Sequence, residues 1–145
     1  MNAKKILIAG IVAGIVGFLL GSILWMNPWI ADLYAQHSDW AGYKPMDAFG
    51  GTMNWLLLMG IGGIVGIVLL AILYSYFEKS LKMEAWKKGA FFGFLFWLAA
   101  SVPAHFNIWL LYTIADIINI TELAIGLVVT VITGAVLAIV YEKVK

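Results

Sequence analysis

The sequence predicts an all-α membrane protein in which four transmembrane helices form two hairpins. Three observations lead to this prediction: apolar residues dominate, they gather in four long uncharged runs, and lysines stand at alternate junctions between the runs. Of the 145 residues, 63% are hydrophobic and only 12% are charged, whereas a soluble domain carries about 25% charged residues. So little charge does not cover a globular surface in water, and the length suits one domain, 1–145.

Each of the four runs is long enough to cross the membrane as a helix. Crossing about 30 Å of hydrocarbon takes about 20 apolar residues, and a helix satisfies its own backbone in lipid. None of the runs contains a charged residue. The first is expected to be retained, because no small-x-small cleavage site follows it. The expected spans cover residues 6–26, 49–77, 89–115 and 123–141, and the longest connection is the outer loop, 27–48.

The lysines predict the orientation of these spans. Eight of the nine lysines fall on one side of the membrane in this topology, and only Lys44 falls on the other. The positive-inside rule places the lysine-rich side in the cytoplasm. We therefore expect a multi-pass protein of the cell membrane with both termini cytoplasmic.

Short matches between the two halves indicate a duplicated hairpin. Gly-Phe-Leu occurs at 17–19 in the first run and at 93–95 in the third, and Glu-Lys follows the second and fourth runs at 78–79 and 142–143. Both hairpins have the same orientation, so they would be parallel repeats, as in some transporters that hold a site between the halves. The alternative is that apolar helices resemble one another by composition alone.

The outer loop is expected to hold an amphipathic helix outside the cytoplasm. Asn27 suits the N-cap and Pro28 the first helical position, and Gly42 and Pro45 favour an end. The apolar face of this helix is expected to contain Trp29, Leu33, His37 and Trp40. Such a helix of about three turns lies flat in the interface, either as an anchor for the loop or as a cover over a cavity that opens outward.

Glycines recur at helical spacing in three of the runs. Small residues on one face let helix backbones approach closely, which drives association in lipid. We expect these faces to pack within the bundle; the alternative is that one of them, most naturally on the first run, binds a second copy or another subunit. The expected packing glycines are Gly10, Gly14, Gly17, Gly21, Gly62, Gly66, Gly89 and Gly93.

Polar side chains gather in the outer halves of the runs. His105 is the one histidine, acidic or basic side chain inside the expected spans, and ionisable groups in membranes are functional-site hypotheses by default. It is expected either to bond Asn54 or the carbonyl freed by Pro103, or to belong to an outward-facing polar pocket. The pocket candidates are His105, Asn107, Asn54, Ser101 and Pro103, with His37 and Asp47 near the mouth.

The same inventory argues against several chemistries. Cysteine and arginine are absent, so thiol catalysis, disulfides and bidentate arginine clamps are excluded. Haem or metal ligation by His105 and His37 has little support, because no carboxylate is evident that would orient either imidazole. No catalytic set, metal site or cofactor is predicted, and the formal net charge of +1 gives no reason to expect nucleic acid.

The chain resembles the small four-helix integral membrane protein families of unknown function found in bacteria and archaea. The resemblance covers the whole chain, implies the four-helix membrane fold and brings no activity with it. Multidrug exporters of similar size carry a buried glutamate in the first span, and this chain has none. The residues that carry the resemblance are Trp25, Asn27, Pro28 and Trp29 after the glycine-rich first run, and Gly93, Trp97 and Pro103 in the third.

Three functions follow from these observations. The first is a non-enzymatic accessory subunit or small lipid- or partner-binding protein, with the bilayer, a second copy or a larger membrane complex as partner. The second is a small channel or transporter that uses the pocket around His105 and Asn54. The third is a membrane enzyme that handles a quinone or another lipid.

Overall fold

The computed structural model describes residues 2–37 and 46–145, and within these ranges the chain is helical and contains no strand. Four helices in these ranges are long and apolar enough to cross a membrane, so the predicted all-α class with four long apolar helices is confirmed. The elements are α1 (Ala3–Trp25), α2 (Pro28–Gln36), η1 (Met46–Phe49), α3 (Thr52–Phe77), η2 (Glu78–Ser80), α4 (Ala85–Phe96), the π-helical turn η3 (Trp97–Ser101), α5 (Val102–Leu111) and α6 (Asp116–Lys143).

The helix bounds differ from the expected spans mainly around the last connection. The third span ends at Leu111, and α6 begins at Asp116, well before the expected start at residue 123. A carboxylate in the first turn suits the positive end of the helix dipole. The helix α6 therefore starts before the apolar run and includes Asn119 and Glu122. The helix α2 begins at Pro28 with Asn27 as its N-cap and ends at Gln36; Trp40, Gly42 and Pro45 lie outside the described residues.

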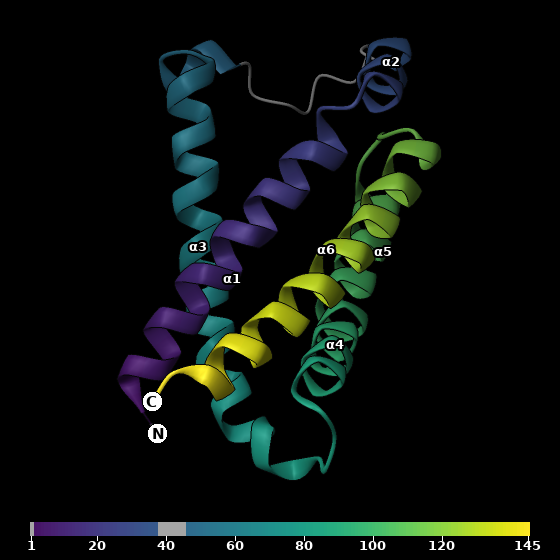
Figure 1. Cartoon of the computed structure of the whole chain (residues 1–145). Helices are drawn as coiled ribbons and strands as arrows, with labels where there is room; N and C mark the ends of the chain where they lie inside the picture. Colours follow the sequence, from purple (N-terminus) through teal and green to yellow (C-terminus); the bar gives the residue numbers. More distant parts are fainter. Residues whose placement is uncertain (1, 38–45) are drawn as a thin grey trace.

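The four long helices form two antiparallel hairpins that meet along α1 and α6 (Figure 1). One hairpin pairs α1 with α3, the other pairs α4 and α5 with α6, and α1 also packs against α6. We call the end with both termini and the α3–α4 connection the inner end, and the end with α2, η1 and the α5–α6 connection the outer end. The hairpins lie together at the inner end, and α3 separates from α5 and α6 toward the outer end.

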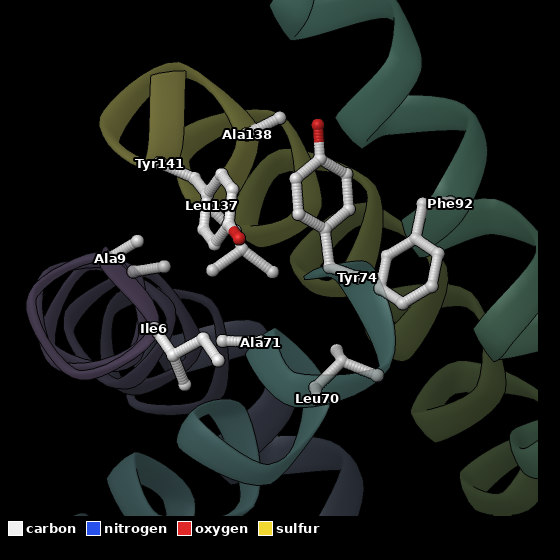
Figure 2. Packing of buried hydrophobic residues seen from close by; sticks show 10 residues of the cluster. Ile6, Ala9, Leu70, Ala71, Tyr74, Phe92, Leu137, Ala138 and Tyr141 are labelled. Carbon is white, nitrogen blue, oxygen red and sulfur yellow. The ribbon is translucent and has the colours of Figure 1, made fainter. Parts of the chain in front are cut away.

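Buried side chains form a hydrophobic cluster at the inner end (Figure 2). The ring of Tyr74 stands between those of Phe92 and Tyr141, with ring centroids 5.3 Å and 5.6 Å away in edge-to-face geometry. Such ring pairs add to packing contacts, and packing drives helix association where the solvent is itself apolar. The cluster therefore joins α3 to both helices of the other hairpin.

Glycines make close helix contacts in both hairpins. A Cβ placed on Gly10 would lie 2.7 Å from the Cα of Val68 in α3. A Cβ on Gly89 would lie 2.1 Å from the carbonyl oxygen of Gly134 in α6, and one on Gly93 would lie 2.2 Å from that of Thr130. The backbones approach this closely only because the side chains are missing.

Other glycines of the sequence pattern have no such contact. A Cβ on Gly21, Gly62 or Gly66 would meet no atom of the described residues within 4 Å, so the expectation that these three pack inside the bundle is corrected. On α3 it is Gly60 that faces a neighbour, the ring of Phe18. The spacing of the glycines alone does not show which face of α3 packs inside the bundle, because the helix is apolar on every side.

The residues that suggested a repeat occupy different environments. Gly17 faces the side chain of Thr133 across the contact between the hairpins, whereas Gly93 lies in the contact within its own hairpin. Gly14, one turn before Gly17, is the residue that packs inside the first hairpin, against Ile64. The two hairpins share a direction, and the duplication remains a prediction.

Charged groups tie the inner end together. The Nζ of Lys88, which is 8% exposed, lies 2.9 Å from Oε1 of Glu142 and joins α4 to the end of α6. The Nζ of Lys5 stands 5.7 Å from the centre of the Tyr141 ring. These contacts bring the first turn of α1 next to the last turn of α6, so the two termini are neighbours (Figure 1).

Candidate functional site

A π-helical turn in the third long helix precedes the site and sets the orientation of α5. Pro103 has no N–H to donate, and its ring crowds the carbonyl four residues earlier. The preceding turn takes up an extra residue: the N–H of Val102 donates to the carbonyl of Trp97, five residues back. Such single-turn insertions are frequent at functional sites.

The extra residue decides which face of α5 meets α6. Trp97 marks the α6-facing side, because its indole N–H donates to the carbonyl of Leu123 at 2.9 Å. In an uninterrupted α-helix the residue seven positions on, Ala104, would share that face. One inserted residue moves the face by one position, so His105 is half-buried against α6 while Ala104 and Asn107 are exposed. The expected place of Asn107 in a pocket is therefore corrected.

His105 pairs with Asn119 on α6. The ring Nδ1 lies 2.6 Å from Oδ1 of Asn119, and Nδ2 of Asn119 donates to the backbone carbonyl of His105 at 3.0 Å. Asn119 is 7% exposed, so the pair satisfies a buried amide that would otherwise be costly in lipid. The sequence led us to expect a bond from His105 to Asn54 or to the carbonyl freed by Pro103. Among the described residues, its partner is Asn119 instead.

The pair forms part of the wall of an open groove between α5 and α6, with a volume of about 330 Å³. Each helix lines it with residues at i, i+3, i+4 and i+7, which is one helical face. Most of the wall is aliphatic or aromatic, and Asp116 stands at the outer end. The lining residues are Val102, His105, Phe106 and Trp109 from α5, and Asp116, Asn119, Ile120 and Leu123 from α6.

The remaining sequence candidates lie away from the groove. Asn54 is exposed at the start of α3 and donates to the carbonyl of Gly50 at 3.3 Å; α3 is separated from α5 at this end (Figure 1), so Asn54 does not join His105. Ser101 lies half-buried in the π-turn, and Pro103 is exposed in the first turn of α5; neither lines the groove.

The two candidates for a pocket mouth lie on the outer connection. Nδ1 of His37 is 2.9 Å from the carbonyl of Leu33 at the end of α2, and Asp47 is exposed in η1. The hydroxyl of Tyr34 donates to the carboxylate of Glu122. This bond ties α2 to the outer part of α6.

Sequence reasoning missed Asn119 and Asp116 as site residues, and Glu122 as the partner of Tyr34. All three fell before the expected start of the fourth span and were assigned to a connection. The signal that could have found them is their spacing: Asp116, Asn119 and Leu123 share one helical face, which predicts that the helix begins earlier than the uncharged run.

The fold has four helices long and apolar enough to span a membrane, as a multi-pass membrane protein would have, and its site is a polar pair in an apolar groove. No family model, curated protein or solved structure matches the chain. In the described parts of the chain, no three histidine or acidic side chains gather where they could hold a metal ion. What the protein does is therefore argued from the groove itself.

Proposed function

We propose that this protein is a small non-enzymatic membrane protein that holds an amphipathic molecule of the bilayer, a lipid or lipid-like compound, in the groove between α5 and α6. The observation that carries the proposal is the His105–Asn119 pair in the wall of an otherwise apolar groove. Polar groups inside a membrane are expensive and mark functional sites. A ligand with a polar head and an apolar body matches both parts of this wall.

The size and place of the groove support a lipid-like ligand. A volume of about 330 Å³ is at the lower end of ligand pockets, which suits a head group and the beginning of an acyl chain while the rest stays in the bilayer. Phe106 and Trp109 are more than half exposed beside it, and aromatic side chains are enriched at the level of lipid head groups.

The proposed topology places the groove in the outer leaflet. All eight lysines of the described residues lie toward the inner end, and the positive-inside rule assigns that end to the cytoplasm. The protein is then a multi-pass protein of the cell membrane with both termini cytoplasmic. In this orientation α2 lies at the outer interface, tied to α6 by Tyr34 and Glu122.

An open face on α3 supports partner binding as a second candidate function. Gly62 and Gly66 have no neighbouring atom of the described residues within 4 Å of a Cβ position, and Ile61, Val65 and Leu69 around them are exposed. Small residues on an exposed transmembrane face favour contact with another helix. The channel hypothesis has less support, since it requires His105 and Asn54 to line one pathway.

Native mass spectrometry of the protein extracted gently from its own membrane tests the proposal. We expect a species that carries one lipid-sized molecule, which His105→Leu loses and Asn107→Leu keeps. Asn107 is the matched control because it is a polar residue of the same helix that lies outside the groove. Equal retention by both variants would contradict binding at this groove, and co-migrating protein subunits without a small molecule would favour the second candidate.

A further inference from the structure

The hydrogen bonds of His105 show whether its second ring nitrogen, Nε2, donates or accepts a hydrogen bond. An amide oxygen only accepts hydrogen bonds, so the contact of Nδ1 with Oδ1 of Asn119 requires the proton on Nδ1. The amide cannot be reversed, because its nitrogen is needed to donate to the carbonyl of His105. The neutral ring therefore keeps an unprotonated Nε2, which accepts a hydrogen bond and has no protein partner among residues 2–37 and 46–145.

The second polar group at the outer end of the groove is a carboxylate. Asp116 is exposed at the first position of α6, and neither salt bridge in the described part of the chain involves it. Its negative charge is stabilised by the helix dipole, and it offsets the attraction that the end of α6 would have for an anion. The groove therefore offers acceptors and negative charge to the head of a ligand.

Among the described residues, the charged side chains of the outer end are all acidic. In the described parts of the chain the outer end carries Asp32, Asp47, Asp116 and Glu122, while every lysine lies toward the inner end. The rings of Phe106 and Trp109, 5.8 Å apart, add the negative faces that attract a cation. Charge complementarity at such a surface favours a cationic group and disfavours an anionic one.

From these contacts we infer that the groove is selective for a membrane lipid whose head group carries a primary ammonium. The ammonium has three N–H donors, which suit the carboxylate of Asp116 and Nε2 of His105, and its charge suits the aromatic pair. The indole N–H of Trp109, which also lines the groove, is a donor for a phosphate oxygen of the same head. This inference rests on the proposed function and specifies its ligand.

The test is a titration of the purified protein with three phospholipids that share acyl chains and differ in head group, read by native mass spectrometry. The heads are phosphoethanolamine, phosphocholine and phosphoglycerol. We expect the ethanolamine lipid to bind about tenfold more tightly than the glycerol lipid, as one charge-assisted hydrogen bond allows. The choline lipid should fall between them, since its quaternary ammonium carries the positive charge but has no N–H.

Two carboxylate variants check the assignment. Asp116→Asn should reduce the preference for the ethanolamine head to about twofold or less, while Asp47→Asn, an exposed outer residue away from the groove, should leave it unchanged. Equal binding of the three lipids, or a preference for the glycerol head, would overturn the head-group inference and leave the lipid-binding function standing. Retention of none of the lipids would overturn both.

Discussion

At the scale of single residues, the most demanding contacts are those between glycine backbones. Gly89 and Gly93 of α4 lie against carbonyl oxygens of α6, whereas a Cβ on Gly62 of α3 would meet no atom of the described residues within 4 Å outside its own helix. A methyl group at Gly89 would meet the backbone of Gly134 and the Cβ of Ala138, neither of which is the end of a flexible side chain. Adding a methyl group is therefore expected to destabilise the bundle at Gly89 and to be tolerated at Gly62.

Replacing Gly89 by alanine should destabilise the protein. Overpacking a tight contact costs about 1–3 kcal/mol, which exceeds the gain of about 1 kcal/mol that alanine brings to a helix interior. Gly62→Ala is the matched control and should be neutral or stabilising. Thermal unfolding in detergent, followed by circular dichroism, measures both. A Gly89→Ala protein as stable as the Gly62→Ala protein would contradict the close approach of α4 and α6.

The pairing of His105 was not predictable from its own segment. The sequence marked His105 as the unusual side chain of the third span, but its partner depends on which face of α5 meets α6. That face follows from the inserted residue before Val102, which no hydropathy pattern reports. Asn119 was passed over for a second reason: it lies before the uncharged run that defined the fourth span.

At the scale of elements, the π-turn acts as one extra residue within the third span. It keeps Gly89 and Gly93 of α4, and also His105 of α5, on the side that faces α6. Removing one residue there should restore an α-helical turn and leave the two flanking faces aligned. Removing one residue from an uninterrupted helix should instead rotate everything beyond it by about 100°.

Two deletions in a cysteine-pair variant test this account. The chain has no cysteine of its own, so the double variant His105→Cys and Asn119→Cys reports the α5–α6 contact through a short thiol cross-linker. Deleting Ala100 from the π-turn should leave the cross-link intact. Deleting Ala124, an equally exposed alanine in the uninterrupted α6, should abolish it. Loss of the cross-link in both deletions would refute the role given to the π-turn.

At the scale of the whole molecule, the sequence predicted the class and the number of long apolar helices, and it did not predict which faces of these helices touch. Length and hydropathy suffice for the former because hydrocarbon thickness sets the length of a span. The contacts are different, since side chains that face lipid and side chains that face another helix are equally apolar. Hydropathy therefore did not predict that Gly62 and Gly66 lie on an open face. It also did not predict that Asn54 is separated from His105.

Because the termini are neighbours at the inner end, the two hairpins can be joined in the reverse order along the chain without changing the helix contacts. Lys5 reaches the ring of Tyr141, so a Gly/Ser linker of about eight residues joins the ends with slack. A circular permutant opened before Met83, in the irregular connection between η2 and α4, keeps every helix pair and returns both new ends to the same membrane face. We expect it to insert, to unfold within a few degrees of the parent, and to retain in native mass spectra the lipid proposed for the groove. Failure to accumulate in the membrane would mean that the first hairpin must be made before the second can dock.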